Sequence, residues 1–121
     1  MAGDPITEIE YKYLQEFLLL WDEYYKQLNE GLAAPEVEPE AEQKFLALHL
    51  RIAQHAQIMK ELLEGEMDFD GNVFKVLTDS VSLDILRGES PIKINHMKSI
   101  WHDATIQARK LQAVLRNRLA A

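Results

Sequence analysis

The chain has 121 residues, of which 47% are hydrophobic and 27% are charged, with a formal net charge of −7 and no cysteine. This length suits one domain with its own hydrophobic core, and this composition excludes a charge-rich disordered chain. The lack of cysteine excludes disulfides, thiolate metal sites and cysteine nucleophiles, and it favours a reducing compartment, so we expect a cytoplasmic protein.

The first predicted helix runs from about Ile6 to Glu30, with Asp4 or Thr7 as its N-cap and Gly31 closing it. The acidic residues near the N-terminus do not resemble a signal peptide, and no apolar run reaches the ~20 residues of a membrane span. The apolar arc of this helix is wide enough to pack against two neighbours. Its members are Ile6, Ile9, Tyr13, Phe17, Leu20, Tyr24 and Leu28, with Leu14, Leu18, Trp21 and Tyr25 beside them.

Residues Leu32 to Glu42 contain two prolines and alternating glutamates, which predict an extended, solvated linker. A second helix is expected from about Glu40 to Leu63, where apolar residues recur at helical spacing. Its predicted core face consists of Phe45, His49, Ile52, Ala56, Met59 and Leu63.

A third helix is predicted from Asp70 to Arg87, although Val81, Leu83 and Ile85 also alternate as in a strand. Asp70 can cap its start and Gly88 can close its end. The last helix follows Ser90 and Pro91, an N-cap and a first-turn proline, and runs to about Leu119. Its predicted core face consists of Ile94, Met97, Trp101, Ala104, Ala108, Leu111, Leu115 and Leu119.

Four helices with three connections predict an all-α fold, an antiparallel four-helix bundle with a Glu/Pro linker between the first two helices. Residues 1–121 would form this one domain.

The charge is divided unevenly along the chain. Residues 1–86 carry eighteen acidic and six basic residues, whereas residues 87–121 carry two acidic and seven basic residues. On a helical wheel four residues of the last helix form one stripe, with Lys110 beside it, and we expect the stripe to point away from the core. The stripe would then face solvent or an anionic partner rather than neutralise neighbours within the bundle. Its members are Lys98, His102, Arg109 and Arg116.

Two carboxylate metal-site patterns are incomplete. The sequence from Asp68 to Asn72 resembles the start of an EF-hand calcium loop, but Val73 replaces the required glycine and Asp79 the bidentate glutamate. Glu61 and Glu64 supply half of the four-carboxylate magnesium site of an all-helical nucleotide pyrophosphohydrolase, but in the other half Val76 occupies the glutamate position ahead of Asp79, so one ligand is missing.

The four histidines, His49, His55, His96 and His102, form two pairs six residues apart, a spacing that does not suit shared ligation. We expect His49 to be a core histidine that bonds Tyr13, Tyr24 or a backbone carbonyl. No cofactor or metal is therefore predicted.

No catalytic motif is present, so the chain is expected to be a non-enzymatic subunit or adaptor that binds another protein or itself. The residues proposed for an apolar interface are Leu19, Trp21, Tyr25, Ile58 and Ile106. One alternative is an accessory subunit of a nucleoprotein complex, in which the basic stripe contacts phosphates, as in small subunits of RNA-guided complexes. A second is a bundle that binds a metal or a small ligand around His49 and the Glu61/Glu64 region.

Overall fold

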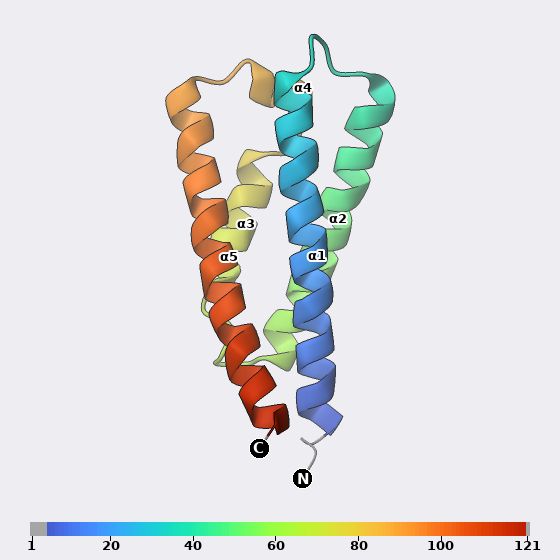
Figure 1. Cartoon of the computed structure of the whole chain (residues 1–121). Coiled ribbons are helices and arrows are strands. Elements are labelled where there is room, and N and C mark those ends of the chain that lie inside the picture. The colour runs from blue at the N-terminus through green and yellow to red at the C-terminus, as the bar shows by residue number, and fades with distance from the viewer. Residues whose placement is uncertain (1–4, 121) are drawn as a thin grey trace.

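The computed structural model describes residues 5–120, which form helices and connecting turns without any strand (Figure 1). The all-α prediction is therefore confirmed, and the strand alternative around Val81 is wrong. Five helices follow one another: α1 (Pro5–Ala33), α2 (Pro39–Leu62), α3 (Asp70–Asp79), α4 (Leu83–Arg87) and α5 (Pro91–Ala120).

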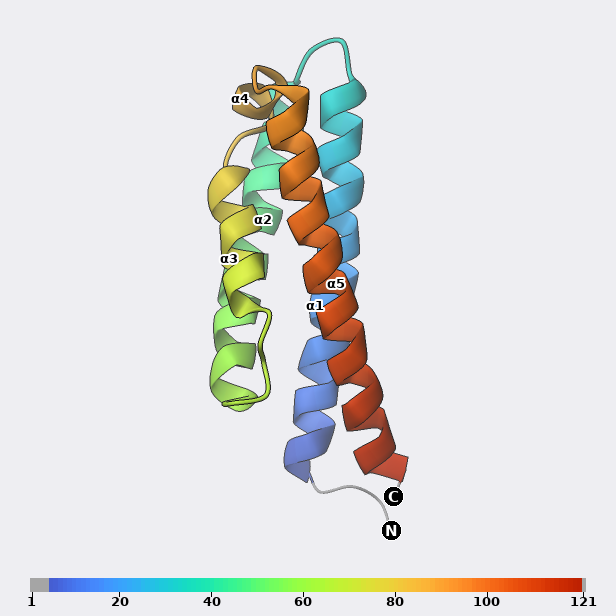
Figure 2. The ribbon, with the colours of Figure 1, turned by 90° about the vertical axis from the view of Figure 1, so that its left-hand side faces the viewer.

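Helix α1 packs against α2 on one side and α5 on the other, and α3 packs against the same two helices. The short α4 lies across one end and contacts α1 and α2. In Figure 2 the lower ends of α1 and α5 extend past the turn between α2 and α3. This arrangement places α2 and α5 at opposite corners, each between α1 and α3.

Helix α1 continues through Gly31, which was predicted to end it. Gly31 is buried, and a Cβ atom added there would lie 2.8 Å from Leu83 Cδ1. Glycine stands at this position because α4 approaches the backbone of α1 closely. Thr7 lies inside α1 rather than at its N-cap, and Asp4 is outside the described residues.

The buried arc of α1 is rotated from the predicted one. Ile6 and Ile9 are 65% and 46% exposed, whereas Trp21 and Leu14 are completely buried. The arc faces both α2 and α5, so the side of the predicted face that carries Leu14, Leu18 and Trp21 is covered, whereas the opposite edge, with Ile9, is not.

The connection after α1 is shorter than the predicted linker, because α1 ends at Ala33 and α2 begins at Pro39. Glu38 precedes α2 in an extended conformation, and Pro39 takes the first helical position, where its missing N–H costs nothing. The predicted core face of α2 is confirmed, except that His49 is only half-buried.

The predicted third helix is interrupted between Asp79 and Leu83, which separates α3 from α4. Ser80, at the break, is completely buried, and its hydroxyl donates to the Val76 carbonyl at 2.5 Å. Because this donor is occupied, the Tyr24 hydroxyl donates to Ser80 Oγ. The break is thus stabilised by a buried chain of hydrogen bonds from α1 to the last turn of α3.

Burial raises the pKa of the Tyr24 phenol, and nearby Asp79 adds to this shift. We expect Tyr24→Phe to lower the free energy of unfolding by about 1 kcal/mol, because it leaves Ser80 Oγ without its donor. The difference in unfolding free energy between the wild type and Tyr24→Phe should narrow above about pH 10. There the tyrosine of the unfolded chain ionises, which stabilises the unfolded state of the wild type only. Urea unfolding of both proteins at neutral and alkaline pH measures this, and an equal difference at both would contradict it.

Helix α4 is capped by a residue of α2. Glu42 accepts hydrogen bonds from the Asp84 N–H and the Ser82 hydroxyl, both at 2.7 Å, and from the Leu83 N–H at 3.3 Å. Ser82 Oγ also accepts from the Ile85 N–H, so the free donors of the first turn are satisfied. Partial burial raises the pKa of Glu42, but these hydrogen bonds outweigh it and hold the pKa below its usual value.

Helix α5 begins as predicted. Pro91 is its first residue, and Ser90 Oγ accepts from the Lys93 N–H at 3.2 Å. Six residues of the predicted core face are buried, whereas Ile94 and Leu119, near its two ends, are only partly covered.

Candidate protein-interaction surfaces

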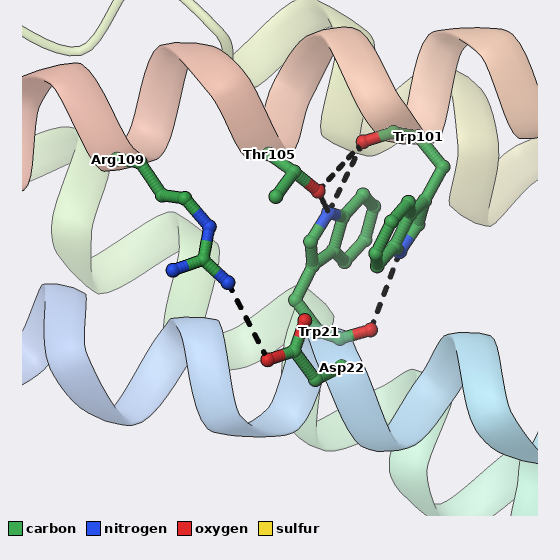
Figure 3. Close-up of polar contacts among 5 residues, drawn as sticks. All are labelled: Trp21, Asp22, Trp101, Thr105 and Arg109. Atoms are coloured by element: carbon green, nitrogen blue, oxygen red, sulfur yellow. Dashed lines mark hydrogen bonds and ion pairs between the residues drawn. The ribbon is translucent and has the colours of Figure 1, made fainter.

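Two tryptophans join the first and last helices (Figure 3). Trp101 Nε1 donates to the Trp21 carbonyl at 3.2 Å, and Trp21 Nε1 donates to Thr105 Oγ1 at 3.0 Å. The two indoles are stacked, with ring centroids 5.8 Å apart. Trp21 is completely buried, so its assignment to an apolar interface is wrong: it belongs to the core. The contact fixes the register of α1 against α5.

Tyr25, another predicted interface residue, also packs within the chain. Its ring stacks on Trp101 with centroids 4.1 Å apart, and its hydroxyl lies 3.3 Å from His102 Nε2. The ammonium group of Lys98 lies 6.0 Å from the centre of the same ring. Tyr25 therefore covers the edge between α1 and α5 and is half-buried.

The basic stripe of α5 lies on the side that faces α1. Lys98 and His102 contact Tyr25, and Arg109 pairs with Asp22 of α1 at 3.8 Å (Figure 3). The expectation that the stripe avoids neighbours within the fold is thus wrong for these three residues. The prediction failed because helical positions about 100° to 140° from the core centre still reach an adjacent helix.

Two cations of the group remain unpaired among the described residues, Lys110 and Arg116, and both are exposed. Arg118, about two turns beyond Lys110, pairs with Glu66, and its guanidinium holds the pKa of that carboxyl below the usual value. Part of the charge on α5 is therefore neutralised within the chain.

Leu19, Ile58 and Ile106 are exposed as predicted, with exposed fractions of 70%, 41% and 53%. They lie on three different helices, α1, α2 and α5. Leu19 lies among charged residues of α1, including Lys12, Glu16 and Glu23, and is an isolated apolar side chain of the kind that most soluble proteins carry.

The outward side of α2 is different, because its exposed residues are almost all uncharged. Leu46 and Leu50 are 45% and 54% exposed, and with Ile58 they make three large apolar side chains along one helix. Between Phe45 and Met59 the only Lys, Arg, Asp or Glu is Arg51. We call this surface the α2 face; it consists of Leu46, Ala47, Leu50, Gln54, Gln57 and Ile58, all exposed.

The α2 face was not predicted as a unit, although Ile58 was. The available signal was the run of fifteen residues with one charge, because the solvent side of an ordinary amphipathic helix is rich in Lys and Glu. A helical wheel places Leu50 nearly opposite buried Ile52, but it does not show whether another helix covers that side.

Two histidines of α2 bond backbone carbonyls of neighbouring helices. His49 Nε2 donates to the Leu77 carbonyl of α3 at 2.5 Å, and His55 Nε2 donates to the Tyr13 carbonyl of α1 at 2.7 Å. The prediction that His49 bonds a backbone carbonyl is confirmed. His49 Nδ1 is buried without a hydrogen-bond partner in the described structure. Both rings hold helices together.

The calcium-loop resemblance is not reflected in the structure. Asp70 is the first residue of α3 and pairs with Lys60 at 3.4 Å, while the Asn72 amide donates to Gln107 of α5. Asp70 does not act as the N-cap, a position that Phe69 occupies without a side-chain hydrogen bond. Within residues 5–120 no three His, Asp or Glu side chains are grouped as metal ligands would be.

A pocket of about 450 Å³ lies between the end of α1, the following turn and the start of α2. Its walls include five glutamates, and Gly31 and Leu83 also line it. Separately, none of the described helices is both long and apolar enough to cross a membrane.

The geometry thus offers two surfaces on opposite corners of the fold, the α2 face and the outer side of α5, which Lys110 and Arg116 border. Comparison of the chain with models of protein families, with curated proteins and with solved structures finds no match.

Proposed function

We propose that this chain is a non-enzymatic subunit or adaptor that binds another protein through the α2 face. In this proposal α1, α2, the α3–α4 pair and α5 act as the four arms of an antiparallel four-helix bundle in the cytoplasm. The bundle provides a rigid support, and the outward side of α2 provides the contact surface.

The observation that carries the proposal is the uncharged surface of α2. The centres of protein interfaces are depleted of charged residues, and contiguous exposed apolar side chains on a soluble protein mark contact sites. Leu46, Leu50 and Ile58 span 12 residues, or about 18 Å of helix. This length suits three turns of a partner helix packed alongside α2.

Binding of phosphates through the basic stripe receives less support. Lys98, His102 and Arg109 already contact residues of α1, and Arg118 pairs with Glu66. Non-specific nucleic-acid binding requires several cations that are free to release counterions, and the net charge of −7 opposes it. A protein contact is therefore the better proposal.

Photo-crosslinking tests the proposal. A photoreactive residue at the exposed position Ala47, in the full chain expressed in its native cells, should give a discrete adduct with one protein. The matched control is the same residue at Glu16, an exposed position on α1. If position 47 gives no adduct beyond the control, or only the adducts seen at position 16, the α2 face is not a contact surface.

A further inference from the structure

We infer that the α2 face binds the outer side of α5 of a second copy of this chain, so that copies associate head to tail. The inference rests on the proposed function and names its partner. It follows from the charges around the α2 face and around the outer side of α5.

The α2 face is bordered by acidic residues at both ends. Glu38 and Glu40 precede it and Glu61 and Glu64 follow it, all exposed. Of the exposed cations of α2, Lys60 is already paired with Asp70, and Lys44 and Arg51 line hollows between α2 and α1. A partner that covers the apolar centre therefore brings its flanking residues close to carboxylates at each end, and basic residues would fit there.

This border argues against pairing of α2 with α2 of another copy. In a parallel pair of α2 helices each acidic end would lie beside the same end of the second helix. In an antiparallel pair it would lie beside the opposite end, which is also acidic. Like charges across an interface are unfavourable, so the two-fold arrangement is disfavoured in both directions.

The outer side of α5 has the complementary pattern. Its outermost residues are uncharged, among them Ile106, which is 53% exposed, and Ala113, which is also exposed. Lys110 and Arg116 flank this line without an ion pair in the described structure, and Asp103 is the exposed acid of this helix.

The spacing along the two helices also agrees at one end. Lys110 and Arg116 lie four and ten residues beyond Ile106, about 6 and 15 Å along α5 at 1.5 Å rise per residue. On α2, Glu61 lies seven residues beyond Gln54, about 10 Å, so the two unpaired cations can reach the carboxylates at one end of the α2 face while the apolar centres meet.

Both surfaces are available on one molecule, because α2 and α5 lie at opposite corners, each between α1 and α3. A contact between two different surfaces leaves one unused surface on each partner. Such a heterologous contact continues to further copies, as a ring or an open chain, unless one of the surfaces is blocked.

Two single substitutions on the full chain test this. Leu50→Glu blocks the α2 face, and Ile106→Glu blocks the α5 side; both positions are exposed, so the variants should fold. By analytical ultracentrifugation the wild type should exceed the monomer mass of 14.0 kDa increasingly with concentration and less so at high salt. Each variant alone should be a monomer. Mixed in equal amounts, they should form a species of twice the monomer mass, because each retains the surface that the other lacks.

Leu19→Glu, at an exposed apolar position outside both surfaces, should associate as the wild type does. Ala47→Glu with Ala113→Glu provides a second pair on the same surfaces, should either first variant unfold by circular dichroism. A monomeric wild type, a monomeric mixture, or self-association of Ile106→Glu alone would each overturn the inference. An adduct of position 47 with a different protein would then leave the proposed function standing without self-association.

Discussion

Trp21→Ala is expected to lower the free energy of unfolding by about 3–5 kcal/mol, the usual cost of removing a large buried aromatic side chain. Trp21 is completely buried, and its ring packs between Phe17, Tyr24 and Trp101, at centroid distances of 5.3, 5.6 and 5.8 Å. The substitution leaves a cavity where the core joins α1 to α5. It also removes the donor to Thr105, whose hydroxyl bonds Trp101 as well.

Urea unfolding followed by far-UV circular dichroism measures this loss without depending on tryptophan fluorescence. The matched control is Leu19→Ala, two residues away on the same helix but 70% exposed, which should change the free energy by less than about 0.5 kcal/mol. Trp21→Phe should lose less than Trp21→Ala, because it keeps the stacking. A loss below about 1.5 kcal/mol for Trp21→Ala would mean that the two helices do not depend on this contact.

Glu42→Ala is expected to cost about 1–2 kcal/mol of unfolding free energy at neutral pH, the range found for removal of a helix N-cap. The carboxylate is the acceptor for two N–H groups and one hydroxyl at the start of α4, and alanine offers none. Glu42→Gln keeps one carbonyl oxygen but not the charge, so its loss should be smaller. Glu61→Ala, an exposed change on the same helix, is the control.

The contribution of Glu42 depends on pH with a definite sign. Its pKa in the folded chain lies below the usual value of 4.5, so the folded state binds this proton less readily than the unfolded state. The full contribution is therefore present above pH 4.5 and is lost as the pH falls through the folded-state pKa. Unfolding curves of the wild type and Glu42→Ala should converge in acid, and a constant difference down to low pH would show that charge is not involved.

The sequence predicts helix positions and core faces well where one periodicity dominates. The start of α5 at Pro91 and the buried residues of α2 follow from local rules, capping and 3.6-residue spacing, that involve only neighbouring residues. The end of α1 does not, because Gly31 is placed by Leu83, fifty-two residues later. A glycine that allows a close approach cannot be distinguished from one that stops a helix without knowing what approaches it.

The break between α3 and α4 has a similar origin. Ser80 can be buried outside a regular helix because its hydroxyl forms hydrogen bonds with Tyr24 and Val76. Glu42 accepts a hydrogen bond at the start of the following helix, α4. Both partners from other helices are distant in sequence. Hydrogen bonds of this kind are decided by tertiary structure, so the apolar stripe alone predicts one continuous helix.

The candidate surfaces were only partly predictable for a geometric reason. A helical wheel gives the angle of a side chain from the core centre, but not which neighbour lies beside it. Arg109 therefore looked solvent-facing although Asp22 is within reach, and Trp21 looked peripheral although α5 covers it. The α2 face required the opposite information, namely that no helix lies outside Leu46 and Leu50.

The contact of Trp21 with Trp101 joins residues eighty positions apart, between the first helix and the last. During synthesis on the ribosome, α1 and α2 emerge long before α5, so the aromatic side chains of α1 have no cover on one side until the chain is almost complete. Closure of the core must follow translation of α5. A nascent or truncated chain ending before Trp101 would expose Trp21, which makes it a substrate for chaperones and proteases rather than a smaller stable domain.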